Sequence, residues 1–114
     1  MRKLYTILLI LALAITTSCH HEHFEADLVV HVKGFISGKP KVDRAVAVFE
    51  TRADAEEEYY AVTPWFYTDS HGEVFIYGLD VGRKYYVRVE GLILTNIKST
   101  NRLDEGTNFI TVRL

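Results

Sequence analysis

Three histidines and a glutamate stand together near the start of the chain, and such side chains can ligate a transition metal. His20, His21 and His23 flank Glu22, and imidazole nitrogen suits zinc, copper and nickel. A tight site holds its ligands at about 2.0–2.2 Å in fixed geometry. Residues 19–25 are instead a short polar stretch after an apolar segment, which is typical of a tether. We predict a linker without a bound metal, with metal coordination as the alternative.

The residue types of a hydrolytic triad occur consecutively at Asp69, Ser70 and His71. Triads are assembled from separate parts of a fold, so that the histidine can bridge the other two side chains. Three neighbours in one turn do not offer that arrangement, and an aspartate in a turn commonly accepts hydrogen bonds from nearby backbone N–H groups. The sequence therefore indicates a structural turn, with Gly72 free to take a positive φ, and no catalytic residue.

Cys19 is the only cysteine, and the segment before it suggests what becomes of its thiol. Arg2 and Lys3 precede an apolar run over residues 4–15, and three small residues then lead to Cys19, which is the pattern of a secretory signal. A helix of the length of that run spans only about 18 Å, against a bilayer core of roughly 30 Å. A lone thiol in an exported protein lacks an intramolecular disulfide partner, which leaves lipid attachment or a free thiol after ordinary cleavage.

The segment that ends at Cys19 resembles the lipobox of bacterial lipoproteins, in a form like that of Bacteroidetes, with Thr16 where the family usually has leucine. The resemblance implies that residues 1–18 are removed as a signal peptide and that Cys19 becomes the acylated first residue. Residues 19–25 then form a lipidated tether and residues 26–114 the folded domain. The resemblance also implies a location in the cell envelope, at the outer membrane, on its periplasmic or surface face.

Removing residues 1–18 leaves 96 residues with 11 basic and 15 acidic side chains. This length supports one domain. A mild negative charge without a basic cluster argues against nucleic acid as a partner, and against electrostatic attraction to anionic membrane surfaces. Membrane attachment is therefore expected through acyl chains on Cys19, each buried CH2 contributing about 0.8 kcal/mol. No cofactor is expected.

The densest aromatic group of the chain lies in residues 59–67. Exposed aromatic rings could stack on sugar rings or on a partner protein. The alternative, which the sequence favours, is that alternate members pack in the core and the others lie along an edge strand. The candidate binding face consists of Tyr59, Tyr60, Trp65 and Tyr67, with Phe66 between the last two.

Apolar and polar residues alternate with a period of two through most of the chain after residue 26, as in strands that bury one face. The expected strands cover residues 27–33, 44–51, 59–68, 74–77, 84–90 and 108–114, and residues 92–97 form a further short strand or a covered loop. Pro64 favours an edge position or a bulge for the third of these. Residues 53–58 form a solvated loop or one helical turn. The pattern predicts an all-β fold, a single small Greek-key β-sandwich of about seven strands.

Residues 68–91, TDSHGEVFIYGLDVGRKYYVRVEG, resemble the core hairpin of transthyretin-like (prealbumin-like) sandwiches, which include carboxypeptidase-regulatory-like modules. The residues that carry the resemblance are Thr68, Asp69, Gly72, Gly78, Leu79, Gly82, Tyr85, Val87 and Val89. We expect Leu79 and Tyr85 to pack inside the sandwich. The resemblance implies a spacer, an adhesin stalk or an appendage of an enzyme. The enzymatic branch of this group ends in Tyr-Arg-Gly-Ser, a motif that is missing from residues 110–114.

These features together predict a non-enzymatic lipoprotein that acts as a binding, structural or spacer module of the cell envelope. The alternative is a lipoprotein that binds a small ligand, a carbohydrate or a peptide, through the aromatic residues 59–67. The expected partners are the membrane, reached through the lipid on Cys19, and an envelope protein or a glycan.

Overall fold

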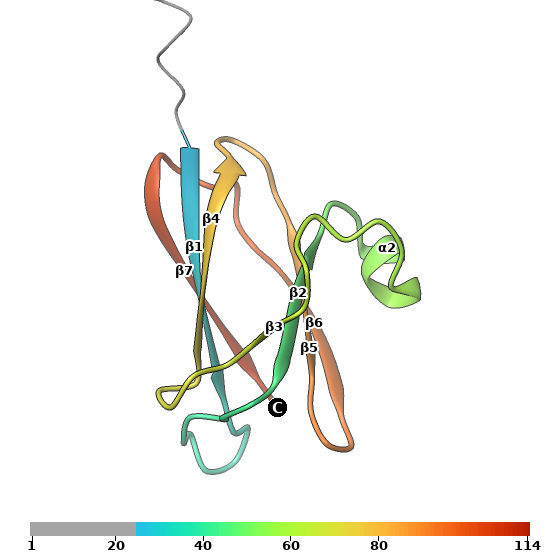
Figure 1. Cartoon of the computed structure of the whole chain (residues 1–114), viewed down its shortest axis with the longest axis vertical. Coiled ribbons are helices and arrows are strands. Elements are labelled where there is room, and N and C mark those ends of the chain that lie inside the picture. The colour runs from blue at the N-terminus through green and yellow to red at the C-terminus, as the bar shows by residue number, and fades with distance from the viewer. Residues whose placement is uncertain (1–24) are drawn as a thin grey trace, which may run out of the picture.

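The computed structural model describes residues 25–114, which form two packed β-sheets and one short helix (Figure 1). The elements are β1 (Glu25–Lys33), β2 (Ala45–Phe49), α2 (Arg52–Glu57), β3 (Phe66–Tyr67), β4 (Glu73–Asp80), β5 (Tyr86–Glu90), β6 (Thr95–Ser99) and β7 (Gly106–Arg113). The predicted fold class, a small all-β sandwich of about seven strands, is confirmed. The first strand begins one residue before the expected start of the domain.

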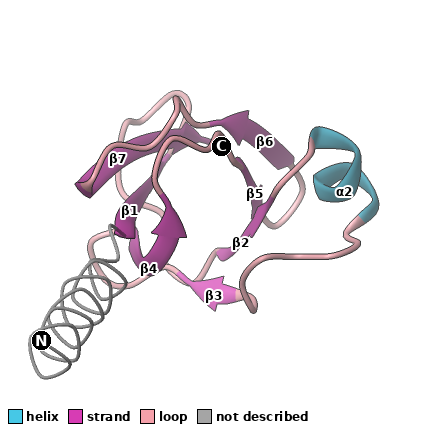
Figure 2. Cartoon of the chain, turned by 90° about the horizontal axis from the view of Figure 1, so that it is seen from above, coloured by secondary structure: helices cyan, strands magenta, loops and turns pink. Residues whose placement is uncertain are grey.

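One sheet has three strands in the order β4-β1-β7, and the other has four in the order β3-β2-β5-β6. Seen from above, the two sheets face each other, and α2 lies outside the four-stranded sheet (Figure 2). β1 is the central strand of its sheet, antiparallel to β4 and parallel to β7. Four of the six connections between consecutive strands, β1–β2, β3–β4, β4–β5 and β6–β7, pass from one sheet to the other.

The space between the sheets is filled by side chains that alternate along their strands. Leu28, Val30 and Val32 of β1 face Val87 and Val89 of β5, and none of these five is more than 1% exposed. Burying an apolar side chain of this size stabilises the fold by roughly 1.5–3 kcal/mol. The other members of this core are Ala26, Val46, Val48, Val74, Ile76, Leu79, Tyr85, Leu103, Ile110 and Val112.

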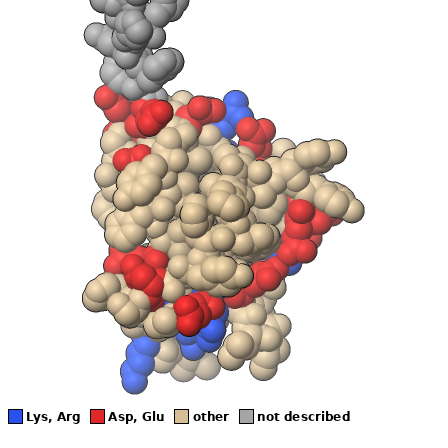
Figure 3. All heavy atoms as spheres, viewed as in Figure 1, with Lys and Arg blue, Asp and Glu red and all other residues tan. Residues whose placement is uncertain are grey.

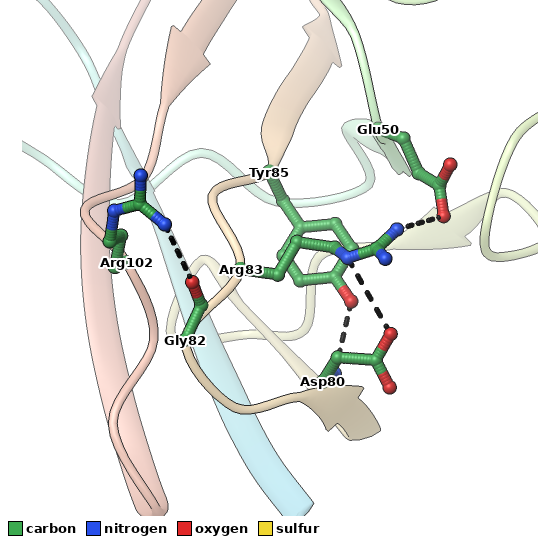
Figure 4. Close-up of polar contacts among 6 residues, drawn as sticks. All are labelled: Glu50, Asp80, Gly82, Arg83, Tyr85 and Arg102. Carbon is green, nitrogen blue, oxygen red and sulfur yellow. Dashed lines mark hydrogen bonds and ion pairs between the residues drawn. The ribbon is translucent and has the colours of Figure 1, made fainter.

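Tyr85 and the turn that precedes β5 close one end of the sandwich (Figure 4). The ring of Tyr85 is buried, and its hydroxyl accepts a hydrogen bond from the backbone N–H of Asp80 at 3.0 Å. Arg83 contacts Glu50 at 2.6 Å and Asp80 at 3.6 Å, two exposed ion pairs of small energetic weight. The expected packing of Leu79 and Tyr85 in the core is confirmed, since neither is more than 4% exposed.

β4 is longer than the strand expected at residues 74–77, because Gly78 forms an irregularity inside it. Gly78 has a φ of +76°, and the pairing with β1 shifts in register between Ala26 and Leu28. An irregularity of this kind bends a strand without ending its pairing. The expected end of the strand was therefore wrong, and the turn begins only after Asp80.

Two other expected segments also differ. Of residues 59–68, only Phe66 and Tyr67 pair in a sheet, as the edge strand β3 beside β2. The edge position agrees with the expectation from Pro64, but the length does not. Residues 92–94 are neither strand nor covered loop: they form an exposed connection, and β6 begins only at Thr95.

Residues 52–57 form a helical turn, which was one of the two possibilities that the sequence left for residues 53–58. The hydroxyl of Thr51 accepts the backbone N–H of Asp54 at 3.1 Å, an N-cap that satisfies one free helix donor. Glu58 ends the helix in the left-handed conformation. Ala55 packs on Ala47 and Phe49 in a second, smaller apolar cluster, so α2 covers part of the outer face of the four-stranded sheet.

Candidate binding surfaces

The aromatic segment 59–67 runs irregularly beside β2 and exposes most of its rings. The backbone N–H of Val62 donates to the carbonyl of Val48 at 2.8 Å, and the hydroxyl of Thr63 accepts the N–H of Val48 at 3.2 Å. The exposed fractions of the candidate side chains are 60% for Tyr59, 86% for Tyr60, 36% for Trp65 and 65% for Tyr67.

Phe66 alone of this group packs against the main core. Trp65 is intermediate, because one edge of its ring meets the buried ring of Phe49 with centroids 6.4 Å apart. Tyr59 and Tyr60 lie against each other at 6.3 Å. The favoured interpretation, alternate burial through the segment, therefore fails outside β3, because the chain there is not a strand.

A cluster of charges fastens α2 to the four-stranded sheet. Arg88 of β5 donates to the carbonyl of Ala55 at 2.8 Å and pairs with Glu58 at 3.4 Å and Glu90 at 3.3 Å. The hydrogen bond between the two carboxyl groups, which needs one proton, raises the pKa of Glu90. These contacts hold α2 against the four-stranded sheet.

The turn Asp69-Ser70-His71 has the structural role that its sequence indicates. One carboxylate oxygen of Asp69 accepts the backbone N–H groups of Glu73 at 3.0 Å and His71 at 2.8 Å. The hydrogen bond from the Glu73 N–H is the main cause that lowers the pKa of Asp69. Gly72 has a φ of +73°, as expected. The side chain of Asp69 thus stabilises the turn.

The outer face of the three-stranded sheet carries a second group of aromatic side chains. Phe75 of β4 and Phe109 of β7 are both paired with Val29 of β1, and they are 49% and 78% exposed. Tyr77, two residues along β4, is 72% exposed. Strand spacing sets the two phenylalanine backbones roughly 10 Å apart, with Val29 between them. The alternation along the strands places these rings outward.

A third exposed apolar surface, not expected from the sequence, lies at the end of the sandwich away from Glu25. Two loops form it, residues 34–40 after β1 and residues 91–94 between β5 and β6, side by side at the lower end of Figure 1. We call it the apolar tip. Its side chains, with their exposed fractions, are Phe35 (72%), Ile36 (98%), Leu92 (86%), Ile93 (94%) and Leu94 (64%).

Two grooves flank Leu94 within the apolar tip. The larger, about 600 Å³, lies between the loops and is lined by Phe35, Ile36 and Leu94, with Lys41 and Arg113 among its polar residues. The smaller, about 200 Å³, lies beside Leu92 and Ile93, with Lys41 and Arg44 among its lining residues. The two grooves and the side chains around them form one continuous stretch of exposed apolar surface with a cationic edge.

Cys19 and the His20–His23 cluster lie outside the described residues. Within residues 25–114, no group of three or more His, Cys, Asp or Glu side chains is placed to hold a metal ion. The same part of the chain contains no helix that is long and apolar enough to span a bilayer.

The chain matches no known family and no curated protein by sequence. Among solved structures it is similar to the major pilin subunit of Bacillus cereus, with 12% identity and a TM-score of 0.59 over 78% of this chain and 28% of the pilin. It is also similar to a "putative carbohydrate binding protein" from Bacteroides uniformis, with 17% identity and a TM-score of 0.53 over 77% of this chain and 40% of that one. This chain thus spans less than half of either neighbour, and the likeness shows a shared β-sandwich fold.

Proposed function

We propose that the protein is a membrane-anchored lipoprotein whose β-sandwich is a non-enzymatic binding module of the cell envelope. The observation that carries the binding role is the set of large apolar and aromatic side chains that the sandwich leaves in solvent. Folding alone gives no reason for Tyr60 to be 86% exposed beside the buried β2. Interfaces use such rings as anchors because a large area is buried on contact.

The anchoring part of the proposal rests on the sequence. The apolar run of residues 4–15, the small residues after it and the lone Cys19 together resemble a lipoprotein signal. Glu25, where the sandwich begins, follows Cys19 by only six positions. Acyl chains on Cys19 would therefore hold the start of β1 close to the membrane, and the apolar tip would face away from it.

The anchor is tested by expressing the full chain with Cys19→Ala in a Gram-negative host. The substitution should release the protein from the membrane fraction or leave the precursor uncleaved, because the acyl acceptor is gone. Ser18→Ala, which keeps a small residue beside the cleavage point, should change neither readout. Unaltered cleavage and membrane retention of the Cys19→Ala chain would refute the lipoprotein assignment.

A second candidate, carbohydrate binding by the aromatic segment 59–67, is favoured by its exposure. Tyr60 and Tyr67 are both more than half exposed, and aromatic faces stack on the apolar faces of sugar rings. The carbohydrate-binding name of one structural neighbour agrees with this candidate. A glycan array probed with residues 20–114 should give hits that disappear in a Tyr60→Ala/Tyr67→Ala variant.

The control for that experiment is Phe75→Ala on the outer face of the other sheet, which should keep every hit. Hits that survive the double substitution would exclude the aromatic segment as the binding site. Loss of the hits in the Phe75→Ala variant alone would assign carbohydrate binding to the three-stranded sheet.

A further inference from the structure

Backbone hydrogen bonds close the base of each loop of the apolar tip. In the first loop, the N–H of Gly34 donates to the carbonyl of Lys39 at 2.8 Å, and the N–H of Gly38 donates to the carbonyl of Gly34 at 3.0 Å. In the second loop, the N–H of Gly91 donates to the carbonyl of Leu94 at 2.7 Å. Beyond these closing bonds, the side chains of Ile36, Leu92 and Ile93 are 98%, 86% and 94% exposed.

The charged side chains that line the two grooves of the tip are all cationic. Lys41 lines both grooves, Arg113 lines the larger and Arg44 the smaller. No acidic side chain lines either groove: Asp43 and Glu90, which precede the lining residues Arg44 and Gly91 in the chain, are absent from both linings. At the lower end of the molecule in Figure 3, Lys and Arg atoms lie on the left side, with Asp and Glu atoms directly above them. An occupant must therefore combine an apolar part with negative charge at its edge.

A second copy of the chain does not meet this requirement. In a symmetric contact between two tips, the same cations from both copies would approach one another. A rigid protein partner would also need a surface shape that fits both loops of the tip at once, the one that carries Ile36 and the one that carries Ile93. Fluid hydrocarbon fills such a space whatever its shape, and phosphate groups at its boundary pair with lysine and arginine.

We propose that the apolar tip inserts into the surface of a lipid bilayer that contains anionic headgroups. The side chains of Phe35, Ile36, Leu92 and Ile93 enter the acyl boundary, and Lys41, Arg44 and Arg113 remain at the level of the phosphates. The overall negative charge of the chain, from which we expected no attraction to such surfaces, does not describe this end of the molecule. Charges at the far end are screened beyond about 8 Å at physiological salt.

The insertion does not depend on the acylation of Cys19, which belongs to the other end of the domain. β1 has nine residues and so sets the tip about 30 Å from Glu25. A chain that is both acylated and inserted would therefore contact two lipid surfaces at once. The tip is tested without Cys19, so failure of the anchor and failure of the tip give different results.

The test uses residues 20–114, which include every member of both core clusters. Binding is measured by flotation with vesicles of phosphatidylcholine mixed with phosphatidylglycerol, and with vesicles of phosphatidylcholine alone. The protein should float with the anionic vesicles, more weakly with the neutral ones, and less as salt is raised. Ile36→Ser/Ile93→Ser should lower the partition coefficient on the order of tenfold or more, since several methylene and methyl groups are lost from the inserted part.

The matched control is Val81→Ser, which changes a 40% exposed apolar residue in the turn after β4, at the opposite end of the sandwich. It should leave vesicle binding unchanged. A Phe35→Trp/Trp65→Phe chain adds a depth readout: its fluorescence should shift to the blue on binding and be quenched by brominated acyl chains.

Failure to float with either vesicle would overturn the proposal and leave a protein partner for the tip. Binding to anionic vesicles that persists in the Ile36→Ser/Ile93→Ser variant, or an unshifted Phe35→Trp spectrum, would also overturn it, because the contact would then be electrostatic and superficial. The Ile36→Ser/Ile93→Ser variant should melt at the temperature of the parent chain, since the two changed side chains are 98% and 94% exposed.

Discussion

Two leucine-to-alanine substitutions remove the same atoms from opposite environments, and together they test the packing of the sandwich. Leu79 is 4% exposed and belongs to the main core, whereas Leu92 is 86% exposed in the apolar tip. Leu79→Ala deletes the equivalent of three methylene groups, about 2.4 kcal/mol of transfer free energy at about 0.8 kcal/mol each. The cavity left behind raises the loss in unfolding free energy to about 2.5–4 kcal/mol.

That loss is a large part of the total, because a domain of this size has about 5–10 kcal/mol of stability. At about 4–8 °C for each kcal/mol, the melting temperature should fall by roughly 10–30 °C. Leu92→Ala should change the unfolding free energy by no more than about 0.5 kcal/mol. Urea denaturation followed by far-ultraviolet circular dichroism measures the loss of unfolding free energy in both variants. Equal losses for the two variants would show that Leu79 does not pack as described.

Three further outcomes are expected. Trp65→Ala should lower the free energy of unfolding by about 1–2 kcal/mol, between the values for surface and core residues, because only one ring edge meets the buried Phe49. Chemical denaturation measures this loss, and a value above about 3 kcal/mol would place the ring in the core. Gly72→Ala should destabilise by at least about 1–2 kcal/mol, because φ is +73° and the new Cβ would lie 2.7 Å from a backbone oxygen of β1; an unchanged melting temperature would contradict the strain. The lowered pKa of Asp69 means that its contribution to stability is present above the unfolded-state pKa and is lost as pH falls through the folded one. Asp69→Asn should therefore lower stability at pH 7 and flatten the acid side of the stability profile, and an acid profile identical to that of the parent would exclude the turn hydrogen bonds as its source.

The strands of the core were predictable because burial of one face leaves a period of two in the sequence. Val87 and Val89 alternate with Arg88 in the sequence just as they do in space. Gly78 misled the same reasoning: a glycine inside a strand looks like the start of a turn, and only the pairing partner shows that the strand continues. The local sequence pattern thus predicted where the core strands lie, but it gave the wrong end for β4.

The candidate surfaces were harder to predict because exposure is a property of the whole fold. The run Leu92-Ile93-Leu94 has the composition of a buried strand, and nothing local distinguishes it from one. It remains outside because Gly91 turns the chain back through its hydrogen bond to Leu94. The aromatic residues 59–67 were found by composition, yet the inward turn of Phe66 alone depends on its pairing with Val46 of β2.

The parallel pairing of β1 with β7 also determines how the domain resists mechanical force. The two strands are paired over their whole length, from Ala26 with Gly106 to Lys33 with Arg113. A pull that separates Glu25 from Arg113 acts along both strands in opposite directions, so their hydrogen bonds are sheared together and cannot open one after another. The rate of unfolding under force is then set by the unfolding barrier of the whole sheet.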